Sequence, residues 1–204
     1  MHPSSSFRMS EAEALSFATQ AGIGHLTTLL DGRIESVLIP FYIDHEHDSP
    51  TIYGHVSASN PQAASISESA DALIIVDGPI AYVSPSLYPT KMESGRVVPT
   101  LNYLSVQIRG RLEPTSSTED FRKLLAALTS RFETKRDEPW SIDDAPPEFI
   151  NVQMKTIRGF SMRIEEIQGV AKHNQNRTEA DRISVHTSFK GGNDDERQIA
   201  EWMI

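Results

Sequence analysis

Residues 84–103, SPSLYPTKMESGRVVPTLNY, combine three prolines with basic and hydroxyl-bearing side chains in one segment that leads into a strand pattern. Lys91 and Arg96 could neutralise a phosphate, and a guanidinium can do so through two parallel hydrogen bonds. Thr100, Asn102 and Tyr103 could orient a heteroaromatic ring by hydrogen bonding and stacking. The alternative is a long surface loop with solvated charges, although loops of this length are more often functional or mobile than inert.

A second polar segment, GHVSASNPQ at residues 54–62, is suited to hold an anion. It places the hydroxyls of Ser57 and Ser59 beside a predicted helix start, with Asn60 as the N-cap and Pro61 as the first helical residue. Free N–H groups and the helix dipole favour a phosphate at such an end. Since Pro61 has no donor, the N–H groups of the next two residues would have to contribute. Chemistry alone favours the alternative, an ordinary capped helix between two strands.

The histidines give little support for a metal site. His45 and His47 lie in an acidic loop, and an H-x-H pair in a solvated loop is more often a polar turn than a zinc site. We therefore predict no metal. His25 and His55 fall in predicted strands, where a structural role is the commoner one, but His55 also belongs to the GHVSASNPQ segment. No G-x-S-x-G, P-loop or H-E-x-x-H pattern is present, so no catalytic residue is assigned.

Composition limits the class of protein. The chain has 204 residues, a net charge of −9, no cysteine and no apolar run of membrane-spanning length, so we expect a cytoplasmic globular protein. The acidic balance disfavours broad contact with phosphate backbones, which needs clustered Lys and Arg. The one basic stretch runs from Lys172 through Arg177 to Arg182, is short and includes two acids, and no helix-turn-helix pattern accompanies it. Direct DNA binding is therefore doubtful.

The elements that must carry these segments are mostly β-strands. Two β-rich runs joined by Asp31-Gly32 predict a hairpin. Alternation predicts a long strand over 100–112, with one face carrying Leu101, Tyr103 and Ser105 and the other carrying Asn102, Leu104, Val106 and Ile108. ALIIVDG and PIAYVS are interpreted as two strands, and TIRGFSMRIEEI as the last strand. Helices are predicted over residues 10–21, from 61, over 117–133, near 147–153, and as two pieces around Gly191-Gly192. Six or seven strands with short helices predict an α+β protein built on an antiparallel barrel.

Three motifs in this order resemble the PaiB-like family of the FMN-binding split-barrel superfamily. They are SPSLY with Lys91 at 84–91, VPTLNY at 98–103 and NQNR at 174–177, and GHVSASNP upstream is also similar. The similarity runs from about residue 10 to Arg182. Both family tryptophans are replaced here, by Leu87 and Leu101. If those indoles pack on the flavin, the replacements weaken or abolish FMN binding; if they are core, leucine is a smaller filler.

The resemblance implies an antiparallel split β-barrel homodimer with FMN at the interface, residues 1–170 forming the barrel domain and 171–204 a helical tail packed on the barrel or on the partner. It places the flavin ring along Leu38, Ile39 and Pro40. It also implies cofactor contacts from the following polar side chains, the last two reaching in from the partner subunit: His55, Ser57, Ser59, Asn60, Lys91, Thr100, Asn102, Tyr103, Gln175 and Arg177.

The family is described as transcriptional regulators, so the resemblance implies a negative regulator that acts directly or indirectly. Two alternatives stay open. One is a flavin-dependent oxidoreductase on an unknown small substrate, because bound flavin supplies the redox chemistry and no acid–base constellation is needed. The other is an interaction or ligand-binding module that has lost its flavin, which the missing tryptophans motivate.

Overall fold

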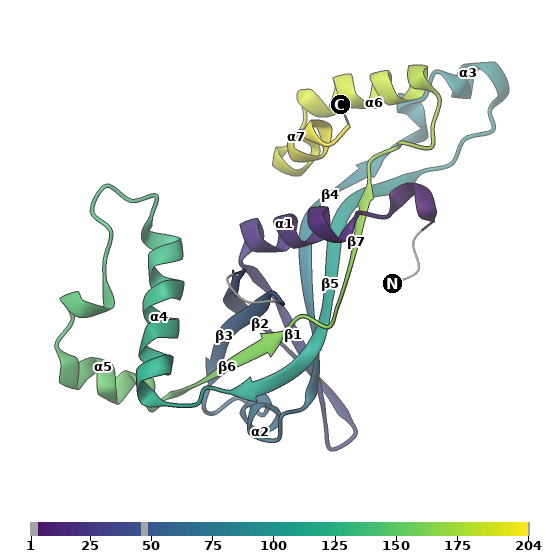
Figure 1. Ribbon diagram of the computed structural model, residues 1–204. Coiled ribbons are helices and arrows are strands. Elements are labelled where there is room, and N and C mark those ends of the chain that lie inside the picture. The colour runs from purple at the N-terminus through teal and green to yellow at the C-terminus, as the bar shows by residue number, and fades with distance from the viewer. Residues whose placement is uncertain (1–3, 46–48, 204) are drawn as a thin grey trace. The chain divides into compact units, whose positions relative to one another are not determined.

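The computed structural model of the protein describes residues 4–45 and 49–203, and Figure 1 traces its elements. The strands are β1 (Ile23–Leu30), β2 (Arg33–Asp44), β3 (Thr51–Ser57), β4 (Asp71–Val83), β5 (Thr100–Pro114), β6 (Ile157–Arg163) and β7 (Glu166–Lys172). They pair in the order β4-β1-β2-β3-β6-β5-β7, and a further pairing of β4 with β5 closes the antiparallel sheet on itself. The predicted α+β barrel is confirmed.

Helices decorate this sheet. They are α1 (Glu11–Ala21), α2 (Gln62–Ser67), α3 (Thr90–Ser94), α4 (Thr118–Glu133), α5 (Pro147–Met154), α6 (Glu179–Lys190) and α7 (Asp194–Glu201), with three short 3-10 turns, η1 (Ser5–Phe7), η2 (Pro85–Leu87) and η3 (Ile142–Asp144). No helix in residues 4–45 and 49–203 is long and apolar enough to cross a membrane.

The first helix, α1, and the first hairpin, β1–β2, form as the sequence predicts. The Ser10 amide and hydroxyl both donate to Glu13 Oε2 at 2.7 Å, and Ser10 Oγ accepts from the Glu13 amide at 3.2 Å, so a capping box starts α1. Gly22 ends the helix with φ +63°. Asp31 and Gly32 both have positive φ, 49° and 77°, which is the backbone that a two-residue hairpin between β1 and β2 requires.

The segment predicted as two strands is one strand, β4. Its buried positions are 72, 74 and 76 and then 79, 81 and 83, so the alternation changes phase at Asp77-Gly78. One extra residue at a Gly is typical of a β-bulge, which bends a strand without ending it. The prediction that TIRGFSMRIEEI is the last strand is also wrong, because β6 ends at Arg163 and β7 follows after two residues.

Contacts divide the chain into two compact units. The first unit comprises residues 1–16, 77–106 and 168–204, and the second comprises residues 17–76 and 107–167. The predicted division at residue 170 stays a prediction. In the second unit α4 is capped by Ser117, whose Oγ accepts from the Asp120 amide at 3.1 Å, and Phe121 and Leu125 pack against Ile142, Ile150 and Met154 around η3 and α5.

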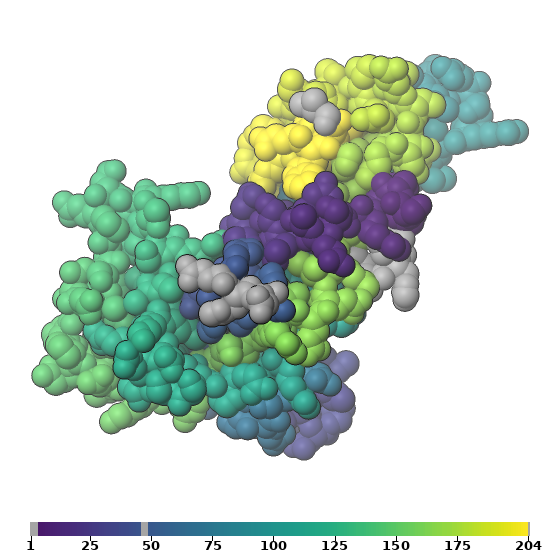
Figure 2. Space-filling view, in the orientation of Figure 1, coloured from purple at the N-terminus to yellow at the C-terminus, as the bar shows by residue number. Residues whose placement is uncertain are grey.

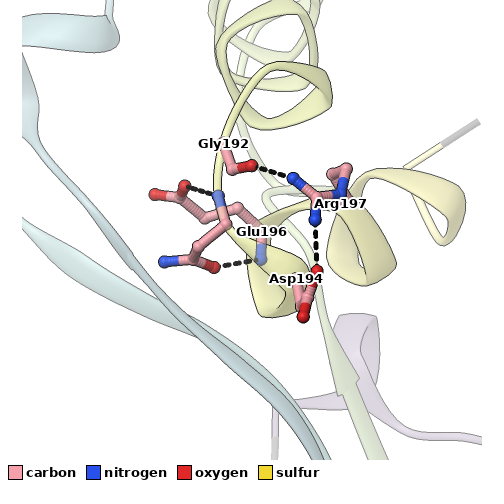
Figure 3. A network of polar contacts seen from close by, with 5 residues as sticks. Gly192, Asp194, Glu196 and Arg197 are labelled. Atoms are coloured by element: carbon pink, nitrogen blue, oxygen red, sulfur yellow. Dashed lines mark hydrogen bonds and ion pairs between the residues drawn. The ribbon is translucent and has the colours of Figure 1, made fainter.

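In the first unit α6 and α7 lie side by side, and α6 also contacts η2 in the 85–99 segment (Figures 1 and 2). Asn193 and Glu196 form a capping box at the start of α7, with N···O distances of 2.9 Å in both directions (Figure 3). Arg197 donates to the Gly192 carbonyl and to Asp194, which ties the Gly191-Gly192 turn to the helix it precedes.

Candidate functional site

In the first unit a latch joins the SPSLY motif to the NQNR motif. The Tyr88 side chain is buried, its hydroxyl lies 3.5 Å from Asn174 Oδ1, and the Arg177 guanidinium lies 4.9 Å above its ring. The Asp181 carboxylate accepts from the Thr90 amide at 3.1 Å and from its hydroxyl at 2.9 Å. Residues separated by about ninety positions in sequence are thereby held together.

Beside this latch lie two cations. Lys172, at the end of β7, donates to the Thr100 hydroxyl at the start of β5 and lies 5.7 Å from the Phe7 ring. Burial, and then the nearby charge of Arg177, lower the pKa of Lys172. Two like charges that disfavour each other would be stabilised by an anion placed between them. The sequence drew attention to Lys172 only as part of a basic stretch, not as a ligand-binding residue.

The same region holds buried polar atoms that lack partners. Asn102 is 0% exposed, and neither its amide nitrogen nor its oxygen has a hydrogen-bond partner within the described residues. Asn174 Nδ2 and His173 Nδ1 are also buried without a hydrogen-bond partner in the described residues. Burial lowers the pKa of His173. Buried polar groups are nearly always paired in native proteins, so such a group calls for an explanation such as a ligand or ordered water.

Three further predicted residues belong to the first unit: Gln175, Tyr103 and Lys91. Gln175 uses its side chain locally, since Nε2 donates to the Ala171 carbonyl at 2.5 Å and Oε1 accepts from the His173 amide at 2.8 Å. Tyr103 is half-buried on the outward side of β5. Lys91 is exposed on α3, a short helix where a loop was predicted.

The two positions where the family has tryptophan are not core positions. Leu101 is 49% exposed on β5, and Leu87 is half-buried at the end of η2. An indole at either place would therefore face outward, at least in part. This excludes a purely core role for the residue at 101.

In the second unit the predicted flavin-ring residues lie on β2 opposite β1. Leu38 and Pro40 pair with His25 and Ile23, and Leu38 is 58% exposed. Ile39 points the other way and is 2% exposed, so only its backbone could touch a ligand outside the barrel.

His55, on β3, lies on the half-buried outward side of its strand. Its Nδ1 has no hydrogen-bond partner in the part of the chain that the structure describes, and burial lowers the pKa of the ring. It is therefore a neutral imidazole at pH 7, able to donate or accept one hydrogen bond from a ligand.

The anion site predicted at the start of α2 is changed by its own cap. The Gln62 amide donates to Asn60 Oδ1 at 2.9 Å and the Ala63 amide to the Asn60 carbonyl at 2.9 Å, so neither N–H is free for a phosphate. The prediction that they contribute was wrong, because the Asn60 side chain and carbonyl satisfy both. What remains is the pair of hydroxyls on Ser57 and Ser59, 2.8 Å apart.

The histidine loop lies only partly within the described residues. His45 Nε2 lies 3.2 Å from the Thr19 hydroxyl, and His47 lies outside the described residues. Over residues 4–45 and 49–203, no three His, Asp or Glu side chains are grouped to hold a metal ion.

The predicted residues thus fall into two clusters. The first unit brings together the 100–103 segment and the 172–177 segment, which meet at the Lys172–Thr100 hydrogen bond. The second unit carries Leu38 to Pro40 on β2 and His55 and the two serines at the end of β3. Tyr88, Asn174 and Lys172 were not predicted as ligand contacts, since only burial and proximity reveal them.

Comparison with known proteins agrees with the family that the sequence motifs resemble. Residues 1–166 match a family model described as "Putative FMN-binding domain". The chain is 30% identical over 199 residues to the protease synthase and sporulation protein PAI 2 of Bacillus subtilis, a match that covers 97% of this chain and 93% of that protein.

Solved structures share the fold at low identity. An FAD and heme binding protein from Mycobacterium smegmatis is 16% identical with a TM-score of 0.59, covering 81% of this chain and 72% of that one. A flavocytochrome from Azotobacter vinelandii is 16% identical with a TM-score of 0.53, covering 81% and 69%. At these identities the likeness concerns the fold alone, the split β-barrel that the sequence predicts.

Proposed function

The chain belongs to the family of FMN-binding domains matched over residues 1–166, and we propose that it is a flavoprotein whose cofactor is FMN. The proposal rests on the family together with one observation, the fully buried and unpartnered amide of Asn102. The pyrimidine edge of a flavin carries both a hydrogen-bond donor and acceptors, which is the set that a carboxamide complements. The residues present therefore fit the group.

The charged end of the cofactor has a candidate contact in the same unit. Lys172 and Arg177 disfavour each other as cations, and a phosphate between them would offset that repulsion. Ser57 and Ser59 offer neutral donors in the second unit, although without the helix N–H groups first expected there. FMN supplies electron-transfer chemistry when bound, and the protein's part is to bind and orient it.

The direct test is the visible absorption spectrum of the purified full chain, before and after addition of FMN and removal of free dye. We expect flavin bands that stay with the protein, and weaker retention by Lys172→Gln than by the exposed control Lys190→Gln. Ser57→Ala tests the second cluster separately. A protein that retains no FMN at high micromolar concentration would refute the proposal and favour the flavin-free module.

We also propose a homodimer, formed through the outward face of β1 and β2. Leu29 and Ile34 pair directly across the hairpin and are 63% and 76% exposed. Leu38 and Ile23 lie on the same face, beyond the polar pair of Thr27 and Ser36. Large apolar side chains exposed together on one face of a protein often mark an interaction site. Ile34→Glu should convert the dimer to a monomer in light scattering, whereas Ile183→Glu on α6 should not; a wild-type monomer would exclude this dimer.

A regulatory role, in this proposal, is indirect. The basic side chains of the 172–182 stretch are engaged inside the first unit: Lys172 contacts Thr100, Arg177 lies on Tyr88, and Arg182 Nη2 donates to the Met203 carbonyl at 3.2 Å. Two of these three cations are assigned to the cofactor phosphate, and the stretch does not make the extended basic patch that a phosphate backbone needs. Pure protein should therefore give no sequence-specific gel shift, and a salt-sensitive specific shift would overturn the indirect role.

A further inference from the structure

Residues 91–99 form a strap in the first unit that is anchored only at its ends. At one end the Thr90 amide and hydroxyl donate to Asp181, and at the other the Thr100 hydroxyl accepts from Lys172. Between these anchors, each hydrogen bond of the strap within the described residues goes to a residue no more than four positions away. In the part of the chain that the structure describes, the strap therefore has no hydrogen bond to the sheet or to α6.

The strap is also largely free of packing. Residues 91–96 and 98–99 are exposed, with Met92 at 88% and Val98 at 65%. Figure 1 shows its helical part, α3, projecting from the end of this unit. Segments with few buried contacts and only local hydrogen bonds open and close at a small cost in free energy. The strap can therefore move while the elements that anchor it keep their structure.

The sequence gives the strap two stiff ends and a pivot. Pro89 and Pro99 stand next to the two anchors, and their rings leave the backbone angle φ little freedom. Gly95, between them, has φ +66°, and a Cβ on it would meet nothing within 4 Å. A glycine in open space passes between left-handed and right-handed backbone without a steric penalty, and hinges of mobile loops are often such small residues. We therefore expect the strap to bend at Gly95.

Two cations on the strap have no acidic partner. Lys91 and Arg96 form no ion pair within residues 4–45 and 49–203. They have the same sign as Lys172 and Arg177, the proposed contacts of the FMN phosphate, so these charges repel the strap from an empty site. A phosphate monoester with a charge of about −1.5 to −2 reverses the sign of this interaction. Ligand binding and movement of the strap are thereby coupled.

We propose that the strap is a lid that closes over the phosphate end of bound FMN and brings Arg96 to the phosphate. A guanidinium can donate two parallel hydrogen bonds to phosphate oxygens, which fixes the closed position of the strap as well as balancing the charge. Closure also gives a role to Lys91, which the motif resemblance assigns to the cofactor but which lies exposed on α3. This lid depends on the FMN site proposed above, and its loss would leave that site in place with faster release of the ligand.

The test is hydrogen–deuterium exchange of the full chain at pH 7, followed by mass spectrometry, without ligand, with saturating FMN and with saturating riboflavin. We expect FMN to slow exchange of the amides in residues 91–98 by about tenfold, which corresponds to a lid closed in roughly nine molecules out of ten. Riboflavin has the same ring without the phosphate and should leave this exchange unchanged. The exposed loop at residues 134–140 in the second unit should exchange equally in all three samples.

Arg96→Gln should reduce the slowing to about threefold or less and speed FMN release in stopped-flow mixing by about threefold to tenfold. Arg136→Gln is the matched control, the same change at an exposed arginine of the second unit, and should alter neither quantity. FMN that stays bound without slowing exchange in residues 91–98, equal slowing by riboflavin, or wild-type behaviour of Arg96→Gln would overturn the lid and leave the flavin site standing. A chain that retains no FMN would refute the flavin site and the lid with it.

Discussion

Replacing Asn102 by leucine should make the flavin-free protein more stable and FMN binding weaker. Asn102 is fully buried, and its amide nitrogen and oxygen both lack a partner in the described residues. A buried unsatisfied polar group costs about 1–3 kcal/mol, and leucine has nearly the same shape without that penalty. For a chain of this size, 1 kcal/mol shifts Tm by roughly 2–4 °C, so a rise of about 2–12 °C is expected.

The assay is thermal unfolding of the flavin-free protein followed by circular dichroism, paired with FMN titration of the same samples. Ser105→Ala is the control on the same strand: the Ser105 hydroxyl donates to Asp77 at 2.9 Å, so its removal should destabilise by about 1 kcal/mol. If Asn102→Leu destabilises the flavin-free protein as Ser105→Ala does, the amide has a partner in the free protein. The inference that it awaits a ligand would then be refuted.

Three further changes test other parts of the structure. Leu101→Trp restores the family residue at an exposed position and should tighten FMN binding by roughly twofold to tenfold in fluorescence titration, whereas the exposed control Ile183→Trp should not. Burial lowers the pKa values of His55 and His173, so the folded state takes up protons less readily than the unfolded state. The free energy of unfolding, measured in urea, should therefore fall as the pH drops below about 6.5. This fall should be smaller in the His55→Gln, His173→Gln double variant. Ser117→Ala removes the N-cap of α4 and should lower the free energy of unfolding by about 1 kcal/mol by the same method, and an unchanged value would show that the cap is replaced by water.

Local signals in the sequence were enough to predict most elements. Asp31-Gly32, the Ser10–Glu13 pair and the Ser117 cap each act within a few residues, so their structures follow from chemistry that the sequence displays. Gly78-Pro79 misled because these residues break strands in isolation, whereas here the burial pattern changes phase at Asp77-Gly78 and β4, paired with β1 and β5, continues as one strand. β7 was not predicted as a separate strand because exposed and buried residues do not alternate along EIQGVAK. Its place in the sheet comes from its pairing with β5, which is distant in the sequence.

The candidate site was less predictable than the fold. Motif positions led to Asn102 and Arg177, but whether an amide is buried without a partner depends on segments about seventy residues away in the chain. The importance of Lys172 comes from its proximity to Arg177 and Thr100, a feature of tertiary packing alone. The N–H groups at the start of α2 were assigned wrongly for the converse reason, because the nearby Asn60 accepts from both, through its side chain and its backbone carbonyl.

The latch between Thr90 and Asp181 has a consequence for how the protein is made. The two residues are 91 positions apart in the chain. During synthesis at about 5–20 residues per second, the SPSLY segment leaves the ribosome roughly 5–20 s before the residue that anchors it. Throughout that interval the segment has none of its contacts with α6, so it is a place where a nascent chain is open to chaperones and proteases. A ribosome that pauses between the two motifs would lengthen this exposure without changing a single residue.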